Sequence, residues 1–329
     1  MSFKLEIPWV EKYRPKDFDD IVSQNVAIKN LKDFVKSGNM PHMIFTGPAG
    51  TGKTSAALII AKRLLKGDRY YRDLLELNAS DTVRMDYVRS VIKDFVNQSM
   101  IINQDFLKIV ILDEADNIPT QVQQALRRII EKTSNNVKFI LMCNYINRII
   151  DPIISRCAVF RFVSLSKEVI VDRLKFIVKQ ENLEIPAEKS DTFFDILYFI
   201  SGGDLRKAIN ALQSAVALEL LEQLDINELL RISGFLDEET LEGLFEAISE
   251  CDFIRTNLIL EKVENLDSRN FIRQILENLP RLKIEQKDEI CLYNVLGEID
   301  YRISQGADEK IQITALMADI IQKINKQKA

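Results

Sequence analysis

The octapeptide GPAGTGKT at 47–54 constrains the fold of this chain more than any other segment. It fits the pattern G-x-x-x-x-G-K-[ST] of a phosphate-binding loop. An apolar run at 43–45 precedes it and a helical pattern at 55–65 follows it, as such a loop requires. Glycines let backbone N–H groups approach phosphate oxygens, and the start of the helix adds positive partial charge. The octapeptide therefore predicts a site for a nucleoside triphosphate.

Two side chains of this loop have predicted roles of their own. Lys53 is expected to contact the β- and γ-phosphates, and the hydroxyl of Thr54 to bind Mg²⁺. A chance glycine-rich turn is the alternative, which the flanking strand and helix disfavour. The residues expected around the phosphates are Gly47, Pro48, Ala49, Gly50, Thr51, Gly52, Lys53 and Thr54.

Up to about residue 164, short apolar runs alternate with helical patterns, which is typical of a parallel α/β sheet. The runs are almost continuously apolar, so we expect strands that are covered on both faces. A helix at 118–132 carries apolar residues at helical spacing and should dock on the sheet through one face. The other expected strands are 74–78, 108–112, 137–144 and 158–162.

Beyond that point the pattern is helical throughout, with a break at Gly202 and Gly203. The expected helices are 166–183, 190–201 and 204–222, and then an array from about 233 that includes 288–304 and 308–324. The sequence thus predicts an α/β P-loop domain with a parallel sheet at 1–164, followed by helical domains at 165–232 and 233–329.

A second phosphate-site motif follows at 108–116, KIVILDEAD. Asp113 ends an apolar strand, which would hold its carboxylate near the metal ion, and Glu114 is placed to orient and deprotonate a water molecule. Two carboxylates after a strand can also simply cap the next helix. Asn144 ends the following strand and can either sense the γ-phosphate, hold the attacking water or serve only as a turn residue.

Charge and cysteine usage exclude several classes of protein. Lys and Arg total 44 against 49 Asp and Glu, so the net charge is −5 and any DNA contact must be a local patch. A single histidine excludes a histidine-based metal cage, and four cysteines without a C-x-x-C pair indicate reduced thiols in an intracellular protein. No apolar leader or 18-residue apolar run occurs, so we expect neither export nor a membrane partner.

Seven motifs in one order resemble the small subunit of replication factor C, an AAA+ clamp-loader ATPase. They are WVEKYRP (9–15), GPAGTGKT (47–54), LNASD (77–81), LDEAD (112–116), CNY (143–145), SRC (155–157) and GGDLRKAINALQ (202–213). The likeness runs through nearly the whole chain, and the tail at 298–318 is similar to the archaeal type. It implies an AAA+ nucleotide-binding domain at 1–164, a helical lid at 165–232 and an all-α collar for oligomerisation at 233–329.

The resemblance also implies roles for single residues in an ATP site. Asn144 matches sensor 1, and Arg206 matches sensor 2, which contacts the phosphates in the same subunit. Arg156 of SRC matches the arginine finger, which points into the neighbouring subunit's site. Of the ALRR segment, either Arg127 or Arg128 contributes at the subunit junction. The residues matching the nucleotide pocket are Val10, Tyr13 and Arg14, with Ile21 and Val22 near the base.

The function implied is ATP-driven loading of a sliding clamp onto primer–template DNA, with Mg²⁺ as the metal ion. The implied partners are other small and large subunits, the clamp and DNA, in the cytoplasm of an archaeon or the nucleus of a eukaryote. Arg89 and Lys93 lie four residues apart and, with Arg84, can bind phosphates, although a solvated charged face is the alternative. The apolar cluster at 100–102 matches a clamp contact or a core segment equally well.

Other interpretations remain at this stage. Residues 113–116 spell DEAD, but a helicase of that name needs a second α/β domain, and 165–329 is helical. A structural subunit that binds ATP without turnover is disfavoured by the intact Lys53, Glu114, Arg156 and Arg206. Another DNA-remodelling AAA+ ATPase is the remaining alternative. His42, Cys143 and Cys157 are expected to be packing residues.

Overall fold

The computed structural model describes residues 7–80, 90–97, 107–133, 136–223, 225–282 and 284–328. The chain forms two compact units, Met1–Leu183 with Ser201–Asn210, and Glu184–Ile200 with Ala211–Ala329. The three-domain division at 164 and 232 stays a prediction. We describe each unit by itself.

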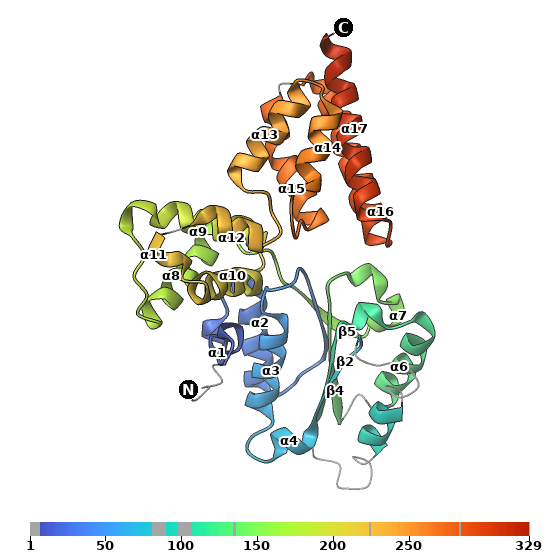
Figure 1. The fold of residues 1–329 in the computed structure, drawn as a ribbon. Helices are drawn as coiled ribbons and strands as arrows, with labels where there is room; N and C mark the ends of the chain where they lie inside the picture. The colour runs from blue at the N-terminus through green and yellow to red at the C-terminus, as the bar shows by residue number, and fades with distance from the viewer. Residues whose placement is uncertain are drawn as a thin grey trace. The chain divides into compact units, whose positions relative to one another are not determined.

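The first unit contains a parallel sheet whose strands all match the predicted ones (Figure 1). Their order across the sheet is β2-β3-β4-β1-β5, and each neighbouring pair is parallel. Parallel neighbours need crossover connections, which the intervening helices supply. The strands are β1 (His42–Thr46), β2 (Leu74–Asn78), β3 (Lys108–Asp113), β4 (Val137–Cys143) and β5 (Cys157–Arg161).

Helices cover both faces of this sheet. On one face, α2 (Asn25–Ser37) and α3 (Lys53–Leu64) pack on Met43 and Phe45 of β1. On the other face, α6 (Thr120–Thr133) belongs to the core that includes Ile44, because successive strand residues point to opposite faces. The helix predicted at 118–132 thus docks through one face as expected.

Strand burial differs from the prediction at the two edges of the sheet. Every residue of β1 is buried, and β3 and β4 are buried along almost their whole length. In β2 and β5 most residues are only partly buried, and Glu76 and Arg161 are exposed. The expectation that all strands are covered on both faces is therefore wrong for these two, because an edge strand has a neighbour on one side only.

Further helices complete the first unit, and several of them lie next to the loops that follow the strands. The N-terminal ones are α1 (Trp9–Lys12) and η1 (Phe18–Asp20), and α4 (Arg69–Asp73) precedes β2. The others are η2 (Ala115–Asn117), η3 (Ile146–Arg148), α7 (Asp151–Ile154) and α8 (Lys167–Gln180). Residues 90–97 are helical too.

The helix predicted at 204–222 is interrupted. α10 (Leu205–Ala217) ends before Glu219, whose φ of 58° lies in the left-handed region, and α11 (Leu220–Gln223) follows. A left-handed residue cannot continue an α-helix, so the periodic pattern alone overestimated the length of this one.

The second unit is helical, as predicted. Its main apolar core joins α13 (Glu238–Ser249), α15 (Ser268–Asn278), α16 (Gln286–Ser304) and α17 (Glu309–Lys328). Aspartates cap four of its helices, because a carboxylate accepts an otherwise unpaired N–H of the first turn. These caps are Asp225, Asp237, Asp252 and Asp267. The remaining elements are η4 (Ala187–Lys189), α9 (Ser190–Ser201), α12 (Ile226–Ile232), α14 (Phe253–Glu261) and η5 (Leu279–Leu282).

Among the helices of the described residues, none combines the length and the apolar character that a membrane crossing needs.

Candidate nucleotide-binding site

The loop between β1 and α3 has a backbone that only glycine can adopt at two positions. Gly47 has a φ of 146°, and a Cβ there would lie 2.0 Å from the carbonyl oxygen of Phe162. Gly50 has a φ of 70°, and its Cβ would lie 1.8 Å from Oδ1 of Asp204. The glycines therefore allow the backbone to make a cradle that larger residues would block, as phosphate binding requires.

Lys53 is the first residue of α3, and its ammonium group lies at the centre of this loop. Its Nζ donates to the carbonyl oxygens of Gly47 (2.6 Å) and Pro48 (2.8 Å) and to Oδ1 of Asn144 (3.0 Å). Burial lowers the pKa of Lys53, and the negative charge of Asp113 opposes that shift. The predicted phosphate lysine and the predicted sensor residue are thus in direct contact.

Thr54 and Asp113 are in contact and carry oxygen atoms of the kind that bind a divalent cation. The Thr54 hydroxyl donates to Oδ2 of Asp113 at 3.0 Å, which joins the start of α3 to the end of β3. Mg²⁺ prefers such hard oxygen ligands and usually takes only one or two from a protein, with the rest from phosphate and water. In the described part of the chain, no cluster of three or more His, Cys, Asp or Glu could hold a metal by itself. The residues present therefore fit Mg²⁺ bound together with a nucleotide.

Glu114 follows in a strained conformation, with a φ of 52°. Its carboxylate accepts hydrogen bonds from the hydroxyl of Ser80 and from the side-chain amide of Asn117 (3.3 Å). The amide of Asn117 also donates to the Ser80 hydroxyl at 2.9 Å. Strained residues cluster at functional sites, where surrounding contacts hold them in place. Here the hydrogen bonds from Ser80 and Asn117 hold the Glu114 carboxylate close to the end of β3.

Asp116 is a functional candidate that the sequence reasoning missed. It is buried in η2, and its Oδ2 accepts the backbone N–H groups of Asn144 (3.2 Å) and Tyr145 (3.1 Å). Hydrogen bonds to a charged group are about twice as strong as neutral ones. Asp116 thereby fixes the backbone from which Asn144 reaches Lys53. The signal was present as the last letter of LDEAD, but its partner is 28 residues away.

Replacing Asp116 with asparagine should slow ATP turnover by about tenfold to a hundredfold, because a charge-assisted hydrogen bond contributes about 1.5–3 kcal/mol. Nucleotide affinity should change little, since Asp116 does not line the pocket. Steady-state ATPase rates and binding of a fluorescent ATP analogue measure the two effects. Asp151→Asn, at an exposed position of α7, is the control. Wild-type turnover in a folded Asp116→Asn protein would contradict the assignment.

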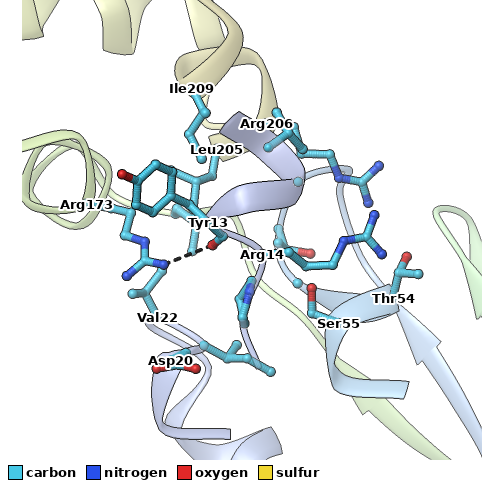
Figure 2. A pocket seen from close by; sticks show the side chains of 17 residues that line it. Tyr13, Arg14, Asp20, Val22, Thr54, Ser55, Arg173, Leu205, Arg206 and Ile209 are labelled. Atoms are coloured by element: carbon cyan, nitrogen blue, oxygen red, sulfur yellow. Dashed lines mark hydrogen bonds between the residues drawn. The ribbon is translucent and has the colours of Figure 1, made fainter. Parts of the chain in front are cut away.

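A pocket opens beside the loop, between α1, η1, α3, α8 and the start of α10 (Figure 2). Ten predicted site residues line it: Val10, Tyr13, Arg14, Ile21, Val22, Gly50, Thr51, Gly52, Thr54 and Arg206. The sequence reasoning missed the rest of the lining: Pro15, Asp20, Ser55, Leu165, Arg173, Leu205 and Ile209.

The pocket has two ends of different chemistry. Figure 2 shows Arg14 and Arg206 pointing to the side on which Thr54 lies, at the start of α3. Val22 and Ile209 are labelled on the side of Tyr13, together with Arg173, whose guanidinium donates to the carbonyl oxygen of Tyr13. Free cations suit phosphate groups and apolar side chains suit a base, so the pocket matches the two parts of a nucleotide.

Tyr13 is held against α8 by three contacts. Its carbonyl oxygen accepts from Nη2 of Arg173 (3.0 Å), its hydroxyl donates to Glu181 (2.5 Å), and its ring packs edge-on against Phe176. Burial and the bond to Glu181 raise the pKa of Tyr13 to about 12, so the hydroxyl stays protonated. The segment 9–15 is therefore fixed to α8.

Arg156 does not line this pocket. It follows α7, where its Nη2 lies 2.6 Å from the carboxylate of Glu131 on α6. Lys93 is exposed on the helical residues 90–97. Arg84, Arg89 and the apolar cluster at 100–102 lie outside the described residues.

The histidine and the two motif cysteines have the environments of packing residues. His42 is buried, and its Nδ1 accepts the N–H of Phe139 at 3.2 Å. Burial lowers the pKa of His42 to about 4, so it is neutral near pH 7. Burial also raises the pKa of Cys143, and that of Cys157 to about 12. Both are free thiols that stay protonated.

The class of protein follows from the fold and this site. Residues 43–165 match the family "ATPase family associated with various cellular activities (AAA)". The RuvB Holliday junction branch migration motor of Thermotoga maritima has a similar fold, with a TM-score of 0.54 at 19% identity, covering 72% of this chain and 80% of that chain. The protein is a P-loop ATPase of the AAA type.

Relatives with higher sequence identity show the particular family. The replication factor C small subunit of Saccharolobus solfataricus is 41% identical over 327 residues, 97% of this chain and 96% of that protein. Replication factor C small subunit 1 of Pyrobaculum islandicum is 40% identical over 318 residues, 96% and 94% respectively. Residues 237–319 match the "Replication factor C C-terminal domain". This chain belongs to the replication factor C small subunit family.

Proposed function

We propose that the chain hydrolyses ATP as one subunit of a clamp loader and thereby drives the placing of a sliding clamp on primer–template DNA. The observation that carries its hydrolytic part is the junction of three strand ends, and its clamp-loading part is supported by the likeness to replication factor C small subunits. The loop after β1, Asp113 of β3 and Asn144 beyond β4 meet through the hydrogen bonds of Lys53 and Thr54. That junction brings the phosphate cradle together with Asp113 and Asn144, which have proposed roles in hydrolysis.

In this proposal the base lies among Val10, Tyr13, Ile21 and Val22, and the phosphates lie on the loop 47–54. Mg²⁺, when bound, would be held by Thr54 and Asp113, partly through water, and would neutralise charge on phosphate oxygens. Arg14 and Arg206 add cations from the same subunit.

Three residues divide the hydrolytic work. Glu114 accepts the proton of the attacking water, because it directly follows Asp113, whose carboxylate accepts a hydrogen bond from Thr54 of the cradle. Asn144 orients the γ-phosphate or that water through its amide. Arg156 acts in trans, contacting the triphosphate of the adjacent subunit, so that bound ATP joins two subunits and its hydrolysis loosens them.

The proposed partners are further small subunits, a large subunit, the clamp and DNA, with the collar at 233–329 joining the subunits. DNA would be bound without regard to sequence through phosphate contacts from Arg84, Arg89 and Lys93. Only a local patch is needed, which agrees with a net charge of −5. Each phosphate contact should make the DNA affinity fall more steeply as the salt concentration rises.

The test compares ATP turnover of the assembled complex with and without clamp and primed DNA. Wild-type turnover should rise most when both are present, whereas another DNA-remodelling ATPase would respond to DNA alone. Glu114→Gln should lower turnover about 10²–10⁴-fold, the usual contribution of a general base, and keep nucleotide binding. Glu188→Gln, at an exposed position of η4 outside the proposed collar, is the matched control.

Two results would contradict the proposal. If clamp and DNA together leave wild-type turnover unchanged, the clamp-loading part is wrong. If Glu114→Gln turns over like the wild type, the assignment of the general base is wrong.

A further inference from the structure

Glu131 on α6 is shared by two arginines from different parts of the first unit. Its Oε1 accepts from Nε of Arg127 at 2.9 Å and lies 2.6 Å from Nη2 of Arg156. Nη1 of Arg156 also donates to the carbonyl oxygen of Pro152 at 2.7 Å. One carboxylate oxygen and one backbone carbonyl therefore fix the guanidinium of Arg156 at the end of α7.

The helix geometry separates Arg127 from its neighbour Arg128. Arg127 and Glu131 are four residues apart, so they share one face of α6. Arg128 is rotated by about 100° around the helix axis, and it is exposed. Arg127 is thus the arginine of this pair that α6 places beside Arg156.

The charges of the cluster leave it able to bind an anion. The hydrogen bond from Arg127, and then the positive charges around it, keep the pKa of Glu131 below its usual range, so its carboxylate is ionised. Two guanidinium groups and one carboxylate leave a net charge of +1. Each guanidinium has five N–H donors, more than these contacts use. Without the carboxylate, two neighbouring cations would repel each other.

We propose that Glu131 is a positioning residue that holds Arg156 and Arg127 together, so that both guanidinium groups meet the triphosphate of an adjacent subunit. This inference rests on the proposed trans role of Arg156. It adds that Arg127, and not Arg128, is the second cation at the subunit junction. It also adds that Glu131 of the subunit that supplies Arg156 controls ATP turnover in the neighbouring subunit that binds the ATP.

The first test measures kcat, KM and the nucleotide dissociation constant of assembled variants. Glu131→Ala should lower kcat by about tenfold to a hundredfold, because small misplacements of a catalytic group have effects of that size. Its dissociation constant for ATP should equal that of the wild type. Arg127→Ala should lower kcat about tenfold or more, while Arg128→Ala should keep wild-type kcat. Exposed ion pairs contribute little to stability, so all three variants should fold.

The second test asks in which subunit Glu131 acts. Assemblies are formed from Glu131→Ala chains mixed with Lys53→Ala chains, which lack the phosphate lysine but keep Glu131 and Arg156. Glu131→Ala chains have an intact cradle, so a Lys53→Ala neighbour should restore their turnover. A role within the same subunit would give no such rescue.

The outcomes separate this inference from the proposed function. Wild-type turnover in Arg156→Ala would remove the trans role and the inference together. Loss of turnover in Arg156→Ala with wild-type kcat in Glu131→Ala would overturn the inference alone. Equal effects of Arg127→Ala and Arg128→Ala, or no rescue in mixed assemblies, would also overturn it.

Discussion

Lys53→Ala is expected to abolish nucleotide binding. The ammonium group is buried at the centre of the loop and bonds three oxygen acceptors there, from Gly47, Pro48 and Asn144. A triphosphate would meet this charge at close range, and each hydrogen bond between charged groups contributes about 1.5–3 kcal/mol. Two such bonds correspond to a loss of affinity of about 10²-fold to 10⁴-fold. Calorimetric titration with ATP measures the change directly.

The control for this variant lies on the same helix. Lys62 is exposed in the last turn of α3, so Lys62→Ala removes an equal charge far along the helix from the loop. It should bind ATP like the wild type. Thermal unfolding of both variants shows whether the loop still folds when its lysine is absent. Tight ATP binding by a folded Lys53→Ala protein would count against the assignment of the phosphate cradle.

Local patterns were sufficient to predict the sheet and the phosphate loop. A motif that requires a strand or a helix beside it also locates that neighbouring element. The cradle 47–54 and the strands β1 and β3 were therefore predicted to within one or two residues. The pocket residues of 9–22 came instead from the resemblance, since periodicity says nothing about where a short N-terminal segment packs.

Contacts between distant segments could not be predicted in this way. Arg173 meets Tyr13 across 160 residues, and no motif marks it. The partners of Asp116 and Glu131 lie on other elements, so no local pattern gives either carboxylate a role. The end of α10 before Glu219 was missed for a local reason, because the left-handed conformation of Glu219 is not marked by a glycine in the sequence.

Arg156→Ala is expected to lower ATP hydrolysis in the assembled complex about 10³-fold or more, the usual effect of losing a trans-acting arginine. The guanidinium lies outside its own subunit's pocket, so the dissociation constant for ATP should stay close to that of the wild type. Single-turnover rates and equilibrium binding of a fluorescent ATP analogue separate these two quantities.

Arg63→Ala is the matched control for this experiment. Arg63 is exposed in the last turn of α3 and pairs with Asp17, which reproduces the exposed ion pair of Arg156 with Glu131 outside the pocket and outside the proposed collar. It should turn over ATP normally. An isolated Arg156→Ala chain should also unfold at the wild-type temperature, since exposed pairs contribute only about 0–1 kcal/mol. A large loss in hydrolysis with unchanged binding and stability is the combination expected when a group that acts in hydrolysis lies outside its own subunit's pocket, and normal turnover would show that Arg156 reaches no triphosphate.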